Sequence, residues 1–101
     1  MPQDKLKVVT IITTLDARER LLNAFAKLGV RGFSASHVEG MGRHGERRSG
    51  LTGTKNILYT VVATEPLSAR LLAWVEEGLL PEFPSIAYST DAVAIAGAPI
   101  N

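Results

Sequence analysis

The feature that most limits the possible folds of this chain is the order of its apolar segments. Residues 6–14 and 56–63 are rich in Val, Ile and Thr, as strands are, and each is followed by a segment with helical spacing and then by a further strand-like segment. The chain has 101 residues, which is the size of one domain. The sequence therefore predicts a single domain, residues 1–101, with a ferredoxin-like α+β sandwich in the order βαββαβ, in which an antiparallel sheet carries both helices on one face.

The first half of the chain contains signals for one helix between two strands. Asp16 is a candidate N-cap, and Glu19 follows three residues later, as in a capping box. The apolar spacing predicts a helix over residues 17–28, and Gly29 fits its C-terminal end. Residues 30–39 alternate weakly and predict a second strand. The strand before this helix is apolar on both faces, so we expect it to be central in the sheet.

The second half repeats this pattern after the third strand. Thr64 can cap a second helix, which Gly78 is expected to end. Residues 79–84 contain two prolines and predict a turn. Residues 86–95 predict a final strand, with Thr90–Asp91 as a candidate break. The apolar stripe of the second helix is formed by Leu67, Leu71, Leu72 and Val75.

Composition excludes several classes of function. The net charge is +1, whereas proteins that bind nucleic acids or membrane surfaces usually carry a large basic excess. The chain has no cysteine, which excludes disulfides, thiolate metal sites and cysteine catalysis. No apolar run approaches the roughly 20 residues that span a bilayer, and residues 1–7 do not resemble a signal peptide. We therefore expect a cytoplasmic protein that is not embedded in a membrane.

The segment between the second and third strands is the strongest functional signal. Residues 40–50 contain four glycines, three arginines and a histidine. Glycine lets backbone N–H groups approach a ligand, and arginine is suited to phosphate and carboxylate oxygens. We expect a mobile loop, residues 40–55, whose base holds an anion such as a nucleotide phosphate. His44 and His37 have no further ligand types beside them, so no metal or other cofactor is expected.

Two other functions stay open on the residues alone. An acylphosphatase-like hydrolase would need an arginine-bearing loop and a positioning asparagine, but neither Asn23 nor Asn56 has an evident relation to the loop. A single-strand nucleic-acid-binding module would place aromatic side chains on the open sheet face, whereas only 6% of the residues are aromatic. No Ser-His-Asp arrangement or carboxylate pair has motif support, so we predict that the protein is not an enzyme.

At Val38–His44, with the sequence VEGMGRH, the chain resembles the PII signalling superfamily. This segment is similar to the family's V-x-G-x-G-R motif at the base of its T-loop, and residues 28–33 match the family's passage from helix to strand. The resemblance implies a homotrimer that binds an adenine nucleotide in each of three clefts between subunits, with a T-loop that engages or releases a protein target. The residues that it assigns to the nucleotide site are Gly40, Met41, Gly42, Arg43, His44 at the start of the loop, Val61, Val62 and, from the first strand, Ile11.

The chain departs from the nitrogen-sensing members of this superfamily. No tyrosine lies in the loop, residues 80–85 lack the glycines and the lysine of their Gly-Asp-Gly-Lys phosphate loop, and no arginine follows Arg70. ADP or AMP is therefore a better expected ligand than ATP.

These departures are similar to the PII-like branch linked to inorganic carbon, and most similar to its carboxysome-associated members. That branch implies bicarbonate as a second ligand and a bicarbonate transporter or carboxysome component as the target. Arg47, Arg48 and Ser49 are assigned either to bicarbonate or to that target.

Overall fold

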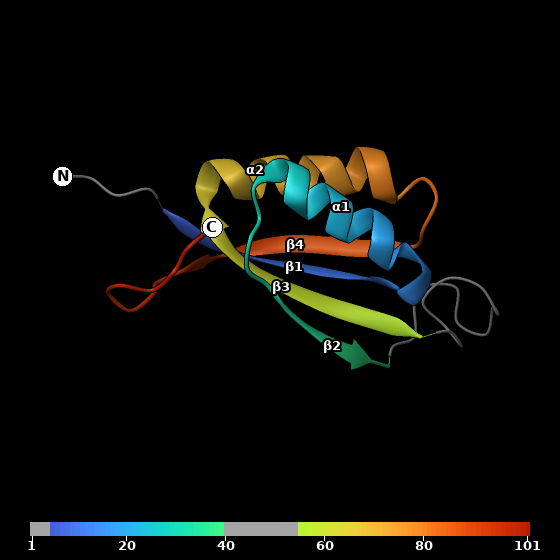
Figure 1. Ribbon diagram of the computed structural model, residues 1–101, viewed down its shortest axis with the longest axis horizontal. Coiled ribbons are helices and arrows are strands. Elements are labelled where there is room, and N and C mark those ends of the chain that lie inside the picture. The colour runs from blue at the N-terminus through green and yellow to red at the C-terminus, as the bar shows by residue number, and fades with distance from the viewer. Residues whose placement is uncertain (1–4, 40–54) are drawn as a thin grey trace.

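The computed structural model describes residues 5–39 and 55–101 of the chain. It has a four-stranded antiparallel sheet in the order β2-β3-β1-β4, and both helices lie over the same face of that sheet (Figure 1). This confirms the predicted ferredoxin-like fold. The elements in chain order are β1 (Leu6–Thr14), the 3-10 turn η1 (Leu15–Ala17), α1 (Arg18–Leu28), β2 (Ser34–Val38), β3 (Asn56–Thr64), α2 (Glu65–Trp74), the π-turn η2 (Val75–Leu79) and β4 (Ser85–Ala92).

β1 is central, as its two apolar faces predicted. It pairs with β3 from Leu6↔Thr64 to Thr14↔Asn56, and with β4 on its other side. Side chains alternate between the two faces of a strand. The alternate residues Val9, Ile11 and Thr13 are buried under the helices, and the residues between them lie on the open face.

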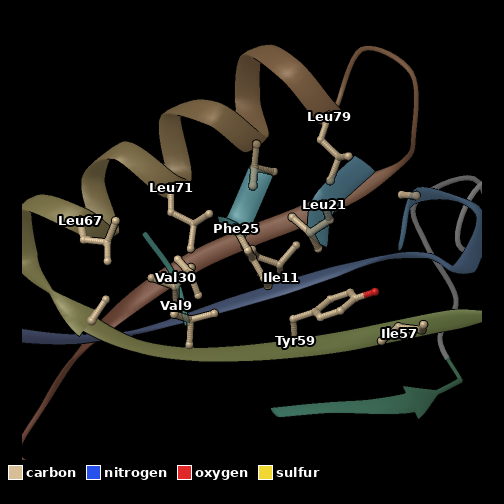
Figure 2. Close-up of a cluster of buried hydrophobic side chains, with 14 residues drawn as sticks. Val9, Ile11, Leu21, Phe25, Val30, Ile57, Tyr59, Leu67, Leu71 and Leu79 are labelled. Carbon is tan, nitrogen blue, oxygen red and sulfur yellow. The ribbon is translucent and has the colours of Figure 1, made fainter. Parts of the chain in front are cut away.

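The core lies between the sheet and the two helices. Figure 2 shows side chains of β1 and β3, among them Ile11 and Tyr59, pointing toward α1 and α2. Phe25 from α1 packs edge-on against Tyr59, with ring centroids 6.1 Å apart, and Phe33 contacts both rings. Burial of each such large side chain contributes about 1.5–3 kcal/mol to folding. The largest fully buried side chains are Tyr59, Phe25, Ile11, Leu21, Ile57, Leu71, Leu79, Val9 and Val61.

The start of α1 differs from the prediction, because Asp16 is not its N-cap. Residues 15–17 form η1, and the chain passes from this turn directly into α1 at Arg18. Ala17 occupies the N-cap position with helical backbone angles, and no side chain caps the helix there. The predicted end is confirmed: Gly29 has φ +96°, and its N–H donates to the carbonyl of Phe25 at 3.0 Å.

Three other boundaries also differ. β2 begins at Ser34 instead of residue 30, and β4 ends at Ala92 and runs through Thr90–Asp91 without a break. The predicted helix end at Gly78 is wrong, since η2 carries the helical backbone to Leu79. Thr64 does occupy the N-cap position of α2, but its side chain makes no cap hydrogen bond. Among the described residues, no helix is long and apolar enough to cross a membrane.

Candidate functional site

Several segments meet at the end of the sheet where residues 40–54 leave it. β2 ends at Val38, which pairs with Asn56 at the start of β3, and Asn56 also pairs with Thr14. β4 begins at the same end, because Ser85 pairs with Thr13. The connection from η2 to β4, residues 80–84, therefore reaches this end of the sheet too (Figure 1). The ends of four strands and this connection form the described frame of the candidate site.

Hydrogen bonds fix this frame. The buried hydroxyl of Thr13 donates to the carbonyl of Pro84 at 3.2 Å and lies 3.0 Å from Ser85 Oγ. Ser85 Oγ donates to the carbonyl of Phe83 at 2.9 Å. The N–H of Leu15 donates to the carbonyl of Lys55 at 2.9 Å, which ties η1 to the residue that follows the glycine- and arginine-rich segment.

The connection of residues 80–84 has no backbone N–H group left for a ligand. The N–H of Leu80 donates to the carbonyl of Val75 at 2.8 Å, and those of Glu82 and Phe83 donate to the carbonyl of Leu79 at 3.0 and 2.9 Å. The other two residues are prolines, which have no N–H. A loop that holds phosphate does so through free backbone N–H groups. This connection therefore cannot act as a phosphate-binding loop in the conformation seen.

Arg20 of α1 holds the same connection from the helical side. Its guanidinium forms an ion pair with Glu82 and lies 5.5 Å from the ring centroid of Phe83. Its Nη1 also donates to the carbonyl of Gly78 at 3.5 Å. Both partners of the ion pair are partly exposed, so the pair itself contributes no more than about 1 kcal/mol. Its effect on the candidate site is that the carboxylate of Glu82 neutralises the charge of Arg20.

The side chain of Tyr59 is fully buried beneath α1. Among the described residues its hydroxyl makes no hydrogen bond of good geometry, although the guanidinium of Arg18 approaches it. Burial raises the pKa of this hydroxyl above 10.0, and the guanidinium of Arg18 partly offsets that rise. The group is therefore neutral at physiological pH and acts as part of the core.

The structure separates the site residues that the resemblance assigned to strands. Ile11 and Val61 are 0% exposed and point into the core, so their side chains cannot contact a ligand in this arrangement. Val61 and Val62, which the resemblance assigned to the nucleotide site, point to opposite faces of the sheet, because adjacent strand residues alternate. Val62 lies on the open face and is half-buried. It is also six residues along β3 from Asn56, about 20 Å at strand spacing, so one protomer does not bring it to the end where residues 40–54 begin.

The remaining predicted site residues lie outside the described part of the chain. These are Gly40, Met41, Gly42, Arg43, His44, Arg47, Arg48 and Ser49, which stay predictions. Conversely, two residues that hold these segments in place, Arg20 and Asn101, carry no motif in the sequence. Arg20 is one of several exposed charges on α1, and Asn101 lies in a segment without periodicity, so no sequence signal could have found either. In residues 5–39 and 55–101, no three His, Asp or Glu side chains converge as metal ligands.

The open face of the sheet carries apolar and hydroxyl side chains, and no part of the described chain covers it. The pairings place Val8, Ile12, Leu58 and Val62 on this face beside Ile86 and Tyr88, which are 48% and 49% exposed. Beyond β4, Val93 and Ile95 are almost fully exposed. An exposed face with several large apolar side chains is typical of an interaction site. Tyr88 is the aromatic residue of this face, which gives little support to a nucleic-acid-binding sheet.

The family model and the solved structures that match this chain indicate the same protein family. The family model for "Nitrogen regulatory protein P-II" matches residues 6–96. No curated protein sequence matches the chain significantly. A solved PII-like signalling protein from Thermus thermophilus is 28% identical, with a TM-score of 0.68 and 91% of each chain covered.

Two further solved structures share the fold at lower identity. CPII, a nitrogen regulatory PII-like protein from Thiomonas intermedia bound to ADP, AMP and bicarbonate, is 22% identical, with a TM-score of 0.75 over 95% of this chain and 97% of that one. The B. subtilis GlnK–ATP complex is 16% identical, with a TM-score of 0.55 over 89% and 85%.

Proposed function

Because the chain belongs to the nitrogen regulatory protein P-II family, whose members are regulatory proteins, we propose that it is a homotrimeric PII-like sensor of the adenylate pool. It binds ADP or AMP in clefts between subunits, takes bicarbonate as a second ligand, and signals through residues 40–55 to a protein target in inorganic-carbon metabolism. It does this in the cytoplasm, in association with a bicarbonate transporter or a carboxysome component.

The observation that carries the choice of ligand is the connection of residues 80–84. It has no free backbone N–H group and contributes the carboxylate of Glu82 instead of a cation. No lysine or arginine follows Arg70 in the sequence. Each phosphate added to a nucleotide adds negative charge that needs donors or cations. A site bounded by the connection of residues 80–84 therefore favours AMP and ADP over ATP, provided that Arg43 supplies the main positive charge.

The trimer is supported by the open apolar face. Burial of apolar surface contributes about 25 cal/mol per Å², and a domain of this size gains only a modest core by itself. Val62 lies on that face, far along β3 from the segment that carries Arg43. A second subunit at this face would let one nucleotide contact both positions, which fits binding at a subunit interface.

Bicarbonate is proposed on the chemistry of the loop and on likeness to the inorganic-carbon branch. It is a small planar anion, and the guanidinium of Arg47 or Arg48 can hold it in a bidentate way, with the Ser49 hydroxyl as a further donor. Ligand binding can shift the protein between loop states only as far as its affinities for those states differ. The protein target would bind the protein according to which loop state is populated.

Calorimetric titration of the full chain with ATP, ADP and AMP, each with and without bicarbonate, tests the proposal. We expect ADP and AMP to bind at least about tenfold more tightly than ATP, which corresponds to about 1.4 kcal/mol. Absence of adenylate binding in every combination would disprove it. Tighter binding of ATP than of ADP would disprove the role given to residues 80–84.

Single substitutions test which arginine contributes to the binding of each ligand. Arg43→Ala should weaken nucleotide binding, and Arg47→Ala should weaken the effect of bicarbonate while nucleotide affinity is kept. Arg70→Ala is the matched control, because Arg70 lies on the helical face and donates only a weak bond, 3.4 Å, to the carbonyl of Leu28. Normal nucleotide binding by Arg43→Ala would show that the assignment of that residue is wrong.

A further inference from the structure

The side chain of Asn101 joins three segments that are far apart in the sequence. Its Oδ1 accepts hydrogen bonds from the N–H groups of Arg31 and Gly32 at 2.8 and 2.9 Å. Its Nδ2 donates to the carbonyls of Gly32 and Val62, both at 2.9 Å. One carboxamide thus binds the connection between α1 and β2 to the edge of β3.

The backbone of Asn101 lies against the same edge. Its N–H donates to the carbonyl of Val62 at 3.3 Å, and its carbonyl accepts from the N–H of Thr64 at 3.2 Å. This is the hydrogen-bond pattern of a parallel bridge centred on Ala63. Residues 97–101, which we call the C-terminal strap, therefore end in the position along β3 that lies directly beyond β2.

That position is the one that a longer β2 would occupy. β2 pairs with β3 from Val38↔Asn56 to Ser34↔Thr60, so the same register continued would pair Gly32 with Val62. The Val62 carbonyl points toward this edge, since it accepts from Asn101, so Gly32 and Val62 would form a hydrogen-bonded pair. The Asn101 side chain binds the N–H and carbonyl of Gly32 and the carbonyl of Val62, which are groups that this pair would use.

The connection itself does not resist such a pairing. Gly32 is not held at positive φ, and a Cβ there would meet no atom within 4 Å. Phe33 already packs its ring against Phe25 and Tyr59 on the helical side of the sheet. Strand alternation would put it on that same side, because Ala35 pairs with Tyr59 and Phe33 would pair with Val61.

We propose that the C-terminal strap and residues 31–33 compete for the edge of β3, and that Asn101 selects between the two arrangements. In the clasped state, which is the one described, Asn101 holds the edge and β2 begins at Ser34. In the zipped state the strap is released and β2 begins near Arg31. β2 leads directly into residues 40–54, so the exchange changes the length of the strand that anchors that segment.

Nuclear magnetic resonance of the full chain tests this exchange with Asn101→Ala. In the zipped register Arg31 and Ala63 form a non-hydrogen-bonded pair, whose Cα atoms lie about 4.5 Å apart and whose Hα atoms give a strong cross-strand NOE. We expect this NOE in Asn101→Ala and not in the wild type. We also expect the Gly32 amide to stay protected from hydrogen exchange within roughly tenfold of the wild type, because Val62 replaces Asn101 as its partner.

Absence of the NOE, with exchange of the Gly32 amide accelerated well beyond tenfold, would overturn the proposal, because the connection would merely have lost a partner. Asn23→Ala is the matched control, since Asn23 is exposed on α1, and it should leave both signals as in the wild type. If Asn101→Ala fails to fold, Asn101→Asp serves instead. It keeps the acceptor oxygen for the N–H groups of Arg31 and Gly32 but loses the Nδ2 donor to both carbonyls, so it should show a weaker form of the same NOE, and exchange of the Gly32 amide accelerated well beyond tenfold without any NOE would also overturn the proposal. The outcome does not depend on nucleotide binding.

Discussion

Gly78 occupies a position in η2 where a methyl group would collide with the indole of Trp74. A Cβ added at Gly78 would lie 2.9 Å from Trp74 Nε1 and 3.1 Å from Cε2. Gly78 also accepts the hydrogen bond from Arg20 that helps to hold residues 80–84. Gly78→Ala therefore tests whether the packing of this ring fixes the turn that leads into the candidate site.

Two opposing effects set the magnitude. Replacing glycine by alanine in helical backbone stabilises a protein by about 0.5–1 kcal/mol. Forcing a side chain out of a packed position costs about 1–3 kcal/mol. Trp74 is half-buried and packs against the core, so its ring cannot move without losing contacts. We expect the cost of displacing the ring to exceed the gain from the backbone. The free energy of unfolding should then fall by about 1 kcal/mol, and Tm by about 4–8 °C for a domain of this size.

The sign should reverse when the ring is removed. In a Trp74→Leu background, Gly78→Ala should stabilise the protein by about 0.5–1 kcal/mol, because only the backbone effect is left. The coupling energy between the two positions is then about 1.5–2 kcal/mol in a double-mutant cycle.

Urea unfolding measures the cycle, followed by far-UV circular dichroism because Trp74 is the only tryptophan. All four proteins must be compared at one concentration, since assembly of subunits would shift the apparent stability. An equal effect of Gly78→Ala in both backgrounds would refute the reasoning, and so would stabilisation by Gly78→Ala alone. Either result would mean that the indole moves aside freely.

Three further predictions concern the core, a surface ion pair and the open face. Tyr59→Phe should raise the free energy of unfolding by about 1 kcal/mol, because it removes a buried hydroxyl that makes no hydrogen bond of good geometry among the described residues. Burial raises the pKa of Tyr59 above 10.0, so the unfolded state loses the phenol proton first and the stability of the wild type falls as the pH rises above 10.0; urea unfolding of Tyr59→Phe should lack this alkaline loss. The hydrogen bond from Lys7, 2.6 Å long, holds the pKa of Asp91 below 3.8, so its contribution is present above that pH and is lost in acid; Asp91→Asn should flatten the acid side of the stability profile. Ile86→Asp on the open face should reduce the mass found by light scattering toward the 10.8 kDa of one protomer while the circular dichroism spectrum is kept, and an unchanged mass would exclude this face as the interface.

The sequence predicted those elements whose conformation depends on the local preferences of their own residues. β1 was predicted with its observed bounds, because a run of β-branched residues between polar ends leaves little choice. The αL end of α1 at Gly29 followed from glycine's access to positive φ. Asp16 was misassigned because η1 keeps the backbone helical before α1, and a side chain caps a helix only from an extended residue.

The start of β2 could not be predicted from its own residues, because a distant residue decides it. Residues 30–33 have a composition that suits a strand, but the N–H of Val30 bonds Phe25 and the groups of the next two residues bond Asn101. The competing partner stands about 70 residues further along the chain. The same long-range character explains why Arg20 was missed at the candidate site, since its three partners lie between residues 78 and 83.

The proposed preference for AMP and ADP rests on backbone geometry as well as on charge. The sequence alone reveals the missing lysine and the two prolines of residues 80–84, but it does not reveal where the other N–H groups point. The π-turn η2 decides that, because it places the carbonyls of Val75 and Leu79 where they accept from Leu80, Glu82 and Phe83. Restoring a lysine at this connection would therefore add one charge without a cradle of N–H groups around it. If the proposed nucleotide site is correct, weak binding of a third phosphate should therefore persist when the charge at position 82 is changed, and titration of Glu82→Lys with ATP and ADP measures this.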